Sequence, residues 1–266
     1  MDVARFGDLT LVDDVSNADW IVASVRNFQY DVGSLLPVNF DAYARVLHPA
    51  HRDGTAGDDL DVTWADVAAA NGRVAHAAME WIAITGDWSF MAQRNQPGLW
   101  DHAPSTGSLP QRQATRLADV LKRFTQDPSE CWFAVWDGYG DAPYRRGTVA
   151  LIQMPQRPMV LLRGPLTAAA TAFSGRQWPE SASLWWPGDR TWCVATDIDL
   201  MSTYVGGTRP CIDAVLADES LEAYEVSVDQ TVHWRSDTIN PTPESPPAPV
   251  TSRGRRPAPP GDTPGQ

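Results

Sequence analysis

Two kinds of hydrophobic periodicity divide the chain near residue 130. Between residues 1 and 125 apolar residues recur mostly at helical spacing, with a few strands among them. Beyond residue 130, short runs rich in aromatic and β-branched residues are separated by turn residues, which is typical of strands. We therefore predict an α+β fold, with an antiparallel sheet packed against helices in a single globular domain.

Three helices are predicted in the first half of the chain. Thr63 begins a capping-box pattern with Asp in place of Glu, and Asn71-Gly72 supplies the stop. Residues 73–85 carry a helical stripe that ends at Gly86. The third helix begins at Pro110 and ends before Asp127-Pro128, and the composition of residues 95–109 indicates a loop.

The second half predicts a set of short strands. They are residues 131–136, 149–153, 159–162, 184–186 and 191–198, with a last strand at 223–228. Two short helices are expected between them, one after Gly164-Pro165 and one over residues 210–216. Pro187-Gly188-Asp189-Arg190 is a strong signal for a tight turn between two of the strands.

The clearest boundary follows Asn240. Residues 241–266 contain nine prolines and no aromatic residue, so this segment cannot bury enough apolar surface to fold. We predict a globular domain over residues 1–240 and a disordered proline-rich tail over 241–266. The tail holds three arginines, one glutamate and one aspartate, and it is mildly basic beside an acidic body.

Charge and composition narrow the possible partners. The chain carries a formal net charge of −12, which argues against binding to nucleic acid or to anionic membrane surfaces. A basic protein remains a candidate partner, and the alternative is that the acidic surface only keeps the protein soluble. No signal peptide and no membrane-spanning run are visible, so a cytoplasmic location is expected. Cys131, Cys193 and Cys211 lie in apolar settings and are expected to be buried and reduced. No cofactor is predicted.

Two motifs are weak candidates for chemistry. His48-x-x-His51-x-Asp53 gathers residue types that bind zinc or iron, but Pro49 and Gly54 indicate a turn and no distant third ligand is evident, so no metal site is predicted. Gly206-Gly207-Thr208-Arg209 opens a predicted helix and offers groups that could bind an anion, although Thr208 is equally expected as an ordinary N-cap.

Tryptophans beside acidic residues give the preferred binding hypothesis. The loop from Trp136 to Asp141 follows a strand and suits ligand contact, but it also reads as an ordinary turn. Trp185-Trp186 and Trp192 flank the turn with Asp189 and Arg190, and alternation places neighbouring indoles on opposite faces. One face is then either exposed for a partner or covered by helices. The candidate surface comprises Trp136, Asp137, Asp141, Trp185, Asp189 and Arg190, and the expected function is non-enzymatic binding of a basic protein.

The alternative is an enzyme. No nucleophile motif is present, and no catalytic residue is nominated. Asp197 and Asp199 alternate at a strand end and are expected to point to one face, as paired carboxylates do. A hydrolase or transferase acting on a small substrate would use Asp137, Asp141, Asp197 and Asp199 with an arginine clamp. It requires two of these carboxylates to meet in one pocket, with one pKa raised.

Three stretches carry a resemblance to known sequences. Residues 39–50, residues 131–140 and Trp185-Trp186-Pro187-Gly188-Asp189-Arg190 with the following residues to Asp197 resemble a family of actinobacterial proteins. This resemblance implies a cytosolic, high-GC bacterial source and no particular activity. The tryptophan-bearing strands and short helices are more weakly similar to the SUKH immunity superfamily, acidic proteins that neutralise toxins, which implies a binding function.

Overall fold

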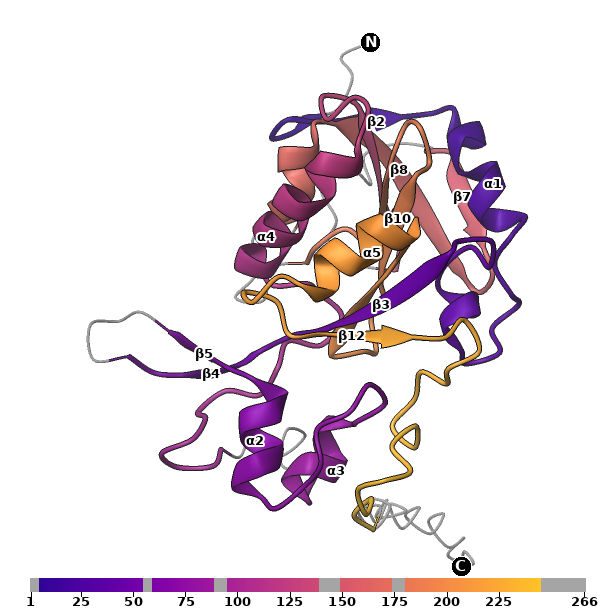
Figure 1. Cartoon of the computed structure of the whole chain (residues 1–266). Coiled ribbons are helices and arrows are strands. Elements are labelled where there is room, and N and C mark those ends of the chain that lie inside the picture. Colours follow the sequence, from indigo (N-terminus) through magenta and orange to yellow (C-terminus); the bar gives the residue numbers. More distant parts are fainter. Residues whose placement is uncertain (1–4, 55–58, 89–94, 139–148, 174–179, 245–266) are drawn as a thin grey trace, which may run out of the picture.

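The architecture is an antiparallel sheet with helices on both faces (Figure 1), which confirms the predicted fold class. The computed structural model describes residues 5–54, 59–88, 95–138, 149–173 and 180–244 of the 266-residue chain. The predicted tail lies outside the described residues from position 245 onward. Within the described part, no helix is long and apolar enough to cross a membrane.

The helices and strands follow one another along the chain in this order. Before residue 130 they are β1 (Arg5–Phe6), β2 (Leu9–Val12), η1 (Val15–Ala18), α1 (Asp19–Val22), η2 (Val32–Ser34), β3 (Ala42–Leu47), β4 (Ala50–Arg52), β5 (Leu60–Val62), α2 (Trp64–Ala70), α3 (Trp81–Thr85), α4 (Gln111–Leu121) and η4 (Lys122–Phe124). After it they are β6 (Cys131–Trp136), β7 (Leu151–Met154), β8 (Arg157–Gly164), η5 (Leu166–Ala170), β9 (Leu184–Pro187), β10 (Trp192–Thr196), β11 (Ser202–Gly207), α5 (Arg209–Leu216) and β12 (Ala223–Val226).

The strands follow the order β1-β2-β8-β6-β9-β10-β11-β3-β12, and the paired strands are antiparallel. β7 pairs with the first half of β8, on the edge whose second half pairs with β2. β4 and β5 form a separate two-stranded ribbon that projects from the body (Figure 1).

Both faces of the central strands are buried. Phe133, Trp185 and Val194 pack on the face covered by α4 and α5, whereas Trp132, Trp186 and Cys193 pack on the opposite face, which the segment of residues 15–36 covers. Trp185 and Trp186 thus point to opposite faces, as strand alternation requires. Their exposed fractions of 2% and 1% show that neither indole is presented to a partner.

A third apolar cluster extends the body below β3, where α2 and α3 lie (Figure 1). Its centre is a chain of edge-to-face indoles, in which Trp81 lies 5.3 Å from Trp64 and 5.2 Å from Trp100 between ring centroids. Such geometry is favourable because the positive edge of one ring meets the negative face of the next. This cluster buries three of the twelve tryptophans.

Most predicted elements after residue 130 are confirmed, as are the helices at α2, α4 and α5. β3 and β11 were not predicted, and the segment after Pro165 is a 3-10 helix, η5. The predicted helix over residues 73–85 is wrong in its first part, because α3 begins only at Trp81. Side chains of Arg45, Gln230 and Asn240 satisfy much of the backbone of residues 74–80, so a helix is not needed there.

Gly107 sets how closely the loop before α4 approaches the turn after β10. Its φ is +79°, and a Cβ at this position would lie 2.6 Å from the backbone oxygen of Ile198. Gly72 has a φ of +64° and open space around the corresponding position.

We expect Gly72→Ala to destabilise the protein by about 1 kcal/mol through backbone strain alone. Gly107→Ala should cost at least about twice as much, because the clash adds to the strain. Urea denaturation measures both, and equal losses would contradict the close approach.

Candidate functional site

The residues of the predicted binding surface lie at opposite ends of the sheet. In the antiparallel register, Ala134 of β6 pairs with Leu184 and Cys131 pairs with Pro187. Trp136 and Asp137 therefore follow one end, whereas Asp189 and Arg190 turn at the other, about 20 Å away for strands of this length. Asp141 lies outside the described residues. The surface expected from the sequence is not one continuous patch.

Several of these residues have structural contacts. Trp185 is buried and stacks on Phe133 at 6.3 Å between centroids. The carboxylate of Asp189 accepts hydrogen bonds from the backbone of Thr191 and of Gln126, which ties the turn to the segment after α4. The guanidinium of Arg190 lies over the indole of Trp20. These contacts explain the residue types at this end without a ligand.

The histidine motif does not converge on a metal. His48 is fully buried, with Nδ1 2.7 Å from the carbonyl of Ser105, and burial lowers its pKa to about 4. His51 pairs instead with Asp61, and Asp53 pairs with His102. Over the part of the chain that the structure describes, no group of three or more His, Cys, Asp and Glu residues could hold a metal ion.

The glycine motif ends a strand rather than forming an anion site. Gly206 and Gly207 belong to β11, and a Cβ on Gly206 would lie 2.5 Å from the ring of Phe40. Thr208 occupies the N-cap position of α5 but makes no capping hydrogen bond with its side chain. Arg209 pairs with Glu225 at 2.7 Å. The glycines are thus explained by close packing.

A pocket of about 340 Å³ lies at the end of the sheet where β6 and β10 finish and β8 begins. We call it the Asp197 pocket. Its apolar wall comes from side chains on the sheet face that segment 15–36 covers, among them Met159, Leu184 and Ala195. Its volume is within the range of sites for small organic ligands.

Arg157, Asp197 and Asp199 form the polar side of the pocket. The Nε atom of Arg157 lies 2.8 Å from Oδ2 of Asp197, and its Nη2 donates to Oδ2 of Asp199 at 3.0 Å. Oδ1 of Asp197 also accepts the backbone N–H of Asp199, which fixes the turn between them. Asp197 is buried, with 9% of its side chain exposed, whereas Asp199 is 74% exposed.

The electrostatics of this cluster favour a cation. Burial raises the pKa of Asp197, and the hydrogen bond from the Asp199 backbone and the charge of Arg157 oppose that rise. One guanidinium faces two carboxylates, so the ionised cluster carries one net negative charge. Asp199 is the member that a ligand can reach, because Asp197 is enclosed and Arg157 is already paired.

Four aromatic side chains line the pocket: Phe28, Tyr30, Trp136 and Trp234. Phe28 and Tyr30 have φ values of 49° and 56°, a region in which bulky residues are strained. The loop is held in this form by an ion pair between Arg26 and Asp31 and by the N–H of Val232, which donates to the carbonyl of Tyr30. Positive φ at two aromatic residues of one pocket is typical of a functional loop.

Sequence reasoning found part of this pocket. Trp136 was in the binding hypothesis, and Asp197 and Asp199 were in the enzyme hypothesis as carboxylates expected to meet in one pocket. The structure brings these two together and raises the pKa of one of them. Arg157, Tyr30 and Trp234 were missed, because their placement depends on strand register and on chain segments far apart in sequence.

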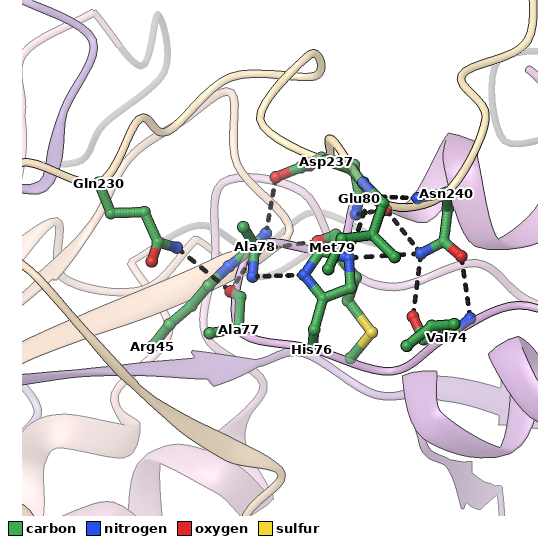
Figure 2. A network of polar contacts seen from close by, with 11 residues as sticks. Arg45, Val74, His76, Ala77, Ala78, Met79, Glu80, Gln230, Asp237 and Asn240 are labelled. Atoms are coloured by element: carbon green, nitrogen blue, oxygen red, sulfur yellow. Dashed lines mark hydrogen bonds and ion pairs between the residues drawn. The ribbon is translucent and has the colours of Figure 1, made fainter.

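A second polar cluster is buried between β3, residues 74–80 and residues 230–240 (Figure 2). Arg45 donates to the carbonyl of Met79 at 2.9 Å and pairs with Glu80 at 3.1 Å. Asp237 pairs with His76 at 3.0 Å and accepts from the backbone and side chain of Asn240. Asn240 in turn bonds the backbone of Val74. This network fastens residues 230–240 to the body, and its groups are occupied by one another.

Comparisons with protein-family models, with curated proteins and with solved structures give no match. The two resemblances inferred from the sequence therefore remain hypotheses.

The buried cluster makes stability depend on pH in a defined direction. Burial raises the pKa of Glu80 to about 7, and the pairing with Arg45 opposes this shift. A carboxyl whose pKa is higher in the folded state stabilises the fold below its unfolded pKa of 4.5, and this contribution is lost as the pH rises through 7. Between pH 5 and pH 8 the wild type should lose roughly 2 to 3 kcal/mol of unfolding free energy relative to Glu80→Gln.

Denaturation of both proteins at several pH values measures this difference. Because both contain the buried His48, its own pH dependence cancels. Asp119→Asn, which removes an exposed carboxylate of α4, is the matched control and should run parallel to the wild type. A difference between wild type and Glu80→Gln that does not change with pH would contradict the raised pKa.

Proposed function

We propose that the protein is a non-enzymatic binding protein whose Asp197 pocket receives a small organic cation with an apolar body. The observation that carries the proposal is the pairing of an apolar, aromatic-lined pocket with an exposed carboxylate in a cluster of net negative charge. The proposed ligand is cationic, as is the basic partner considered from the net charge of −12. The proposed contact is a pocket, whereas the sequence-based hypothesis placed it on an extended surface.

The pocket offers contacts both to the hydrocarbon group and to the cationic nitrogen of such a ligand. Met159, Leu184 and Ala195 offer surface to a hydrocarbon group, whose burial contributes about 25 cal/mol per Å². The exposed carboxylate of Asp199 attracts a cationic nitrogen, and Tyr30, which is 58% exposed, lines the same pocket with its aromatic ring. An anion would meet the carboxylate of Asp199, and Arg157, the arginine among the described residues that line the pocket, is paired with both aspartates.

A cytoplasmic location is part of the proposal. The three cysteines are buried and free of disulfides, and burial raises the pKa of Cys131 and Cys211 to about 12. Thiols in this state suit a reducing compartment.

Binding of three matched probes tests the pocket. We expect 4-phenylbutylamine to bind about tenfold more tightly than 4-phenylbutanol, with 4-phenylbutyrate weakest, because the three share an apolar body and differ in charge. Calorimetric titration, with indole fluorescence as a second readout, measures the three affinities.

The variant Asp199→Asn should abolish the preference for the amine and leave the affinity of the alcohol nearly unchanged. Asp119→Asn, on α4 and therefore on the other side of the sheet, is the control and should preserve the preference. If the amine and the alcohol bind equally to the wild type, or if neither binds, the proposal is wrong.

A carboxylate-based hydrolase or transferase is the second candidate, favoured by the raised pKa of Asp197 beside Asp199. The occupied oxygens of Asp197 weaken it, since both are already engaged by Arg157 and one also accepts the Asp199 backbone. Chromogenic aryl glycosides, esters and phosphates test this function. Turnover that falls at least about a hundredfold in both Asp197→Asn and Asp199→Asn would replace the binding proposal, whereas turnover unaffected by either excludes this candidate.

A further inference from the structure

Two indoles and the final described residues form a surface next to the Asp197 pocket. Trp88 and Trp234 lie edge to face at 5.4 Å between centroids. A hollow beside them is lined by Trp234, Arg235, Thr242, Pro243 and Glu244. Nε1 of Trp88 donates to the carbonyl of Glu244 at 2.8 Å. An indole that donates to a carbonyl beside a proline is a contact by which aromatic grooves hold extended proline-rich chains.

We propose that this surface, together with the rim of the Asp197 pocket, is the docking site for residues 245–256 of the same chain, with the arginines at 253, 255 and 256 placed at Asp199. The inference rests on the proposed function, because it takes the preference of the pocket for a cation as given. The proposed occupant is a segment of this molecule. It is chosen because it begins beside the hollow, directly after Glu244, and because it carries three arginines.

The hollow beside Glu244 and the Asp197 pocket share a wall, which supports the proposed path of the tail. Trp234 lines both the Asp197 pocket and the hollow whose walls include Pro243 and Glu244. A chain that leaves Glu244 along this indole is therefore directed toward the Asp197 pocket. Trp234 is 37% exposed, and the guanidinium of Arg235 lies over its ring at 4.2 Å from the centroid, so the tail would contact the part of the indole that Arg235 does not cover.

Length and charge also agree. Arg253 is nine residues beyond Glu244, which corresponds to roughly 28 Å of extended proline-rich chain. Residues 245–266 carry three arginines and one aspartate on a chain whose net charge is −12. An arginine side chain has an apolar stem and a cationic head, which is the ligand class that the pocket selects.

Paramagnetic relaxation enhancement on the full chain tests the docking directly. A nitroxide can be attached to Ser252→Cys alone, because the three native cysteines are buried. At low salt we expect the amides of Asp197, Asp199 and Trp234 to lose intensity, while those of α4 do not. The loss should fall at high salt and in the background of Arg253→Gln, Arg255→Gln and Arg256→Gln, since both remove the charge attraction.

Three outcomes would overturn the proposal: pocket amides that lose no more intensity than those of α4, a loss that is unchanged in the triple variant, or a loss seen only between labelled and unlabelled molecules in a mixed sample. The last would place the tail on a second copy.

Failure of docking is distinguishable from failure of the proposed function, because the affinity of 4-phenylbutylamine is measured separately in the triple variant. Docking predicts that this variant binds the amine about threefold or more tightly than the wild type, because the pocket is no longer partly occupied.

Discussion

Burial of both faces of the central strands is the constraint on which the rest of the molecule depends. β6, β9 and β10 are apolar on each side, so helices or loops must cover both surfaces. α4 and α5 cover one, and the segment of residues 15–36 covers the other. No polar group can then act from the middle of these strands. Chemistry is confined to the strand ends and to the loops that meet there, which is where Asp197 and Arg157 lie.

The same constraint explains what the sequence could predict of the fold. Strands such as β6 and β10 were recognisable because runs buried on both faces are continuously apolar and end at turn residues. β3 was missed because it contains Arg45, a residue that argues against a buried strand unless its partners are known. Glu80 and the carbonyl of Met79 supply those partners, and both come from the segment that was predicted as a helix. One long-range network therefore accounts for two errors.

The site was predictable only in its local parts. Asp197 and Asp199 could be paired from their spacing, since strand alternation operates over two residues. Arg157 lies forty residues earlier, and it reaches them because β8 begins where β10 ends. In contrast to Arg157, which the sequence did not connect to the site, Trp136 was placed on one surface with Asp189 and Arg190 although they lie far apart. They were grouped by residue type, although antiparallel pairing places the end of β6 and the turn after β9 at opposite ends of the sheet.

The wall of the pocket that carries Trp234 is held by contacts on either side of it. Before it, Val232 bonds the strained loop at Tyr30, and Gln230 bonds the carbonyl of Ala77. After it, Asp237 and Asn240 are fixed by the buried network (Figure 2). Trp234 itself is partly exposed, so its position depends on these anchors rather than on its own burial. The buried network therefore anchors the segment that carries this wall of the pocket, and the placement of Trp234 rests on residues that do not themselves line the pocket.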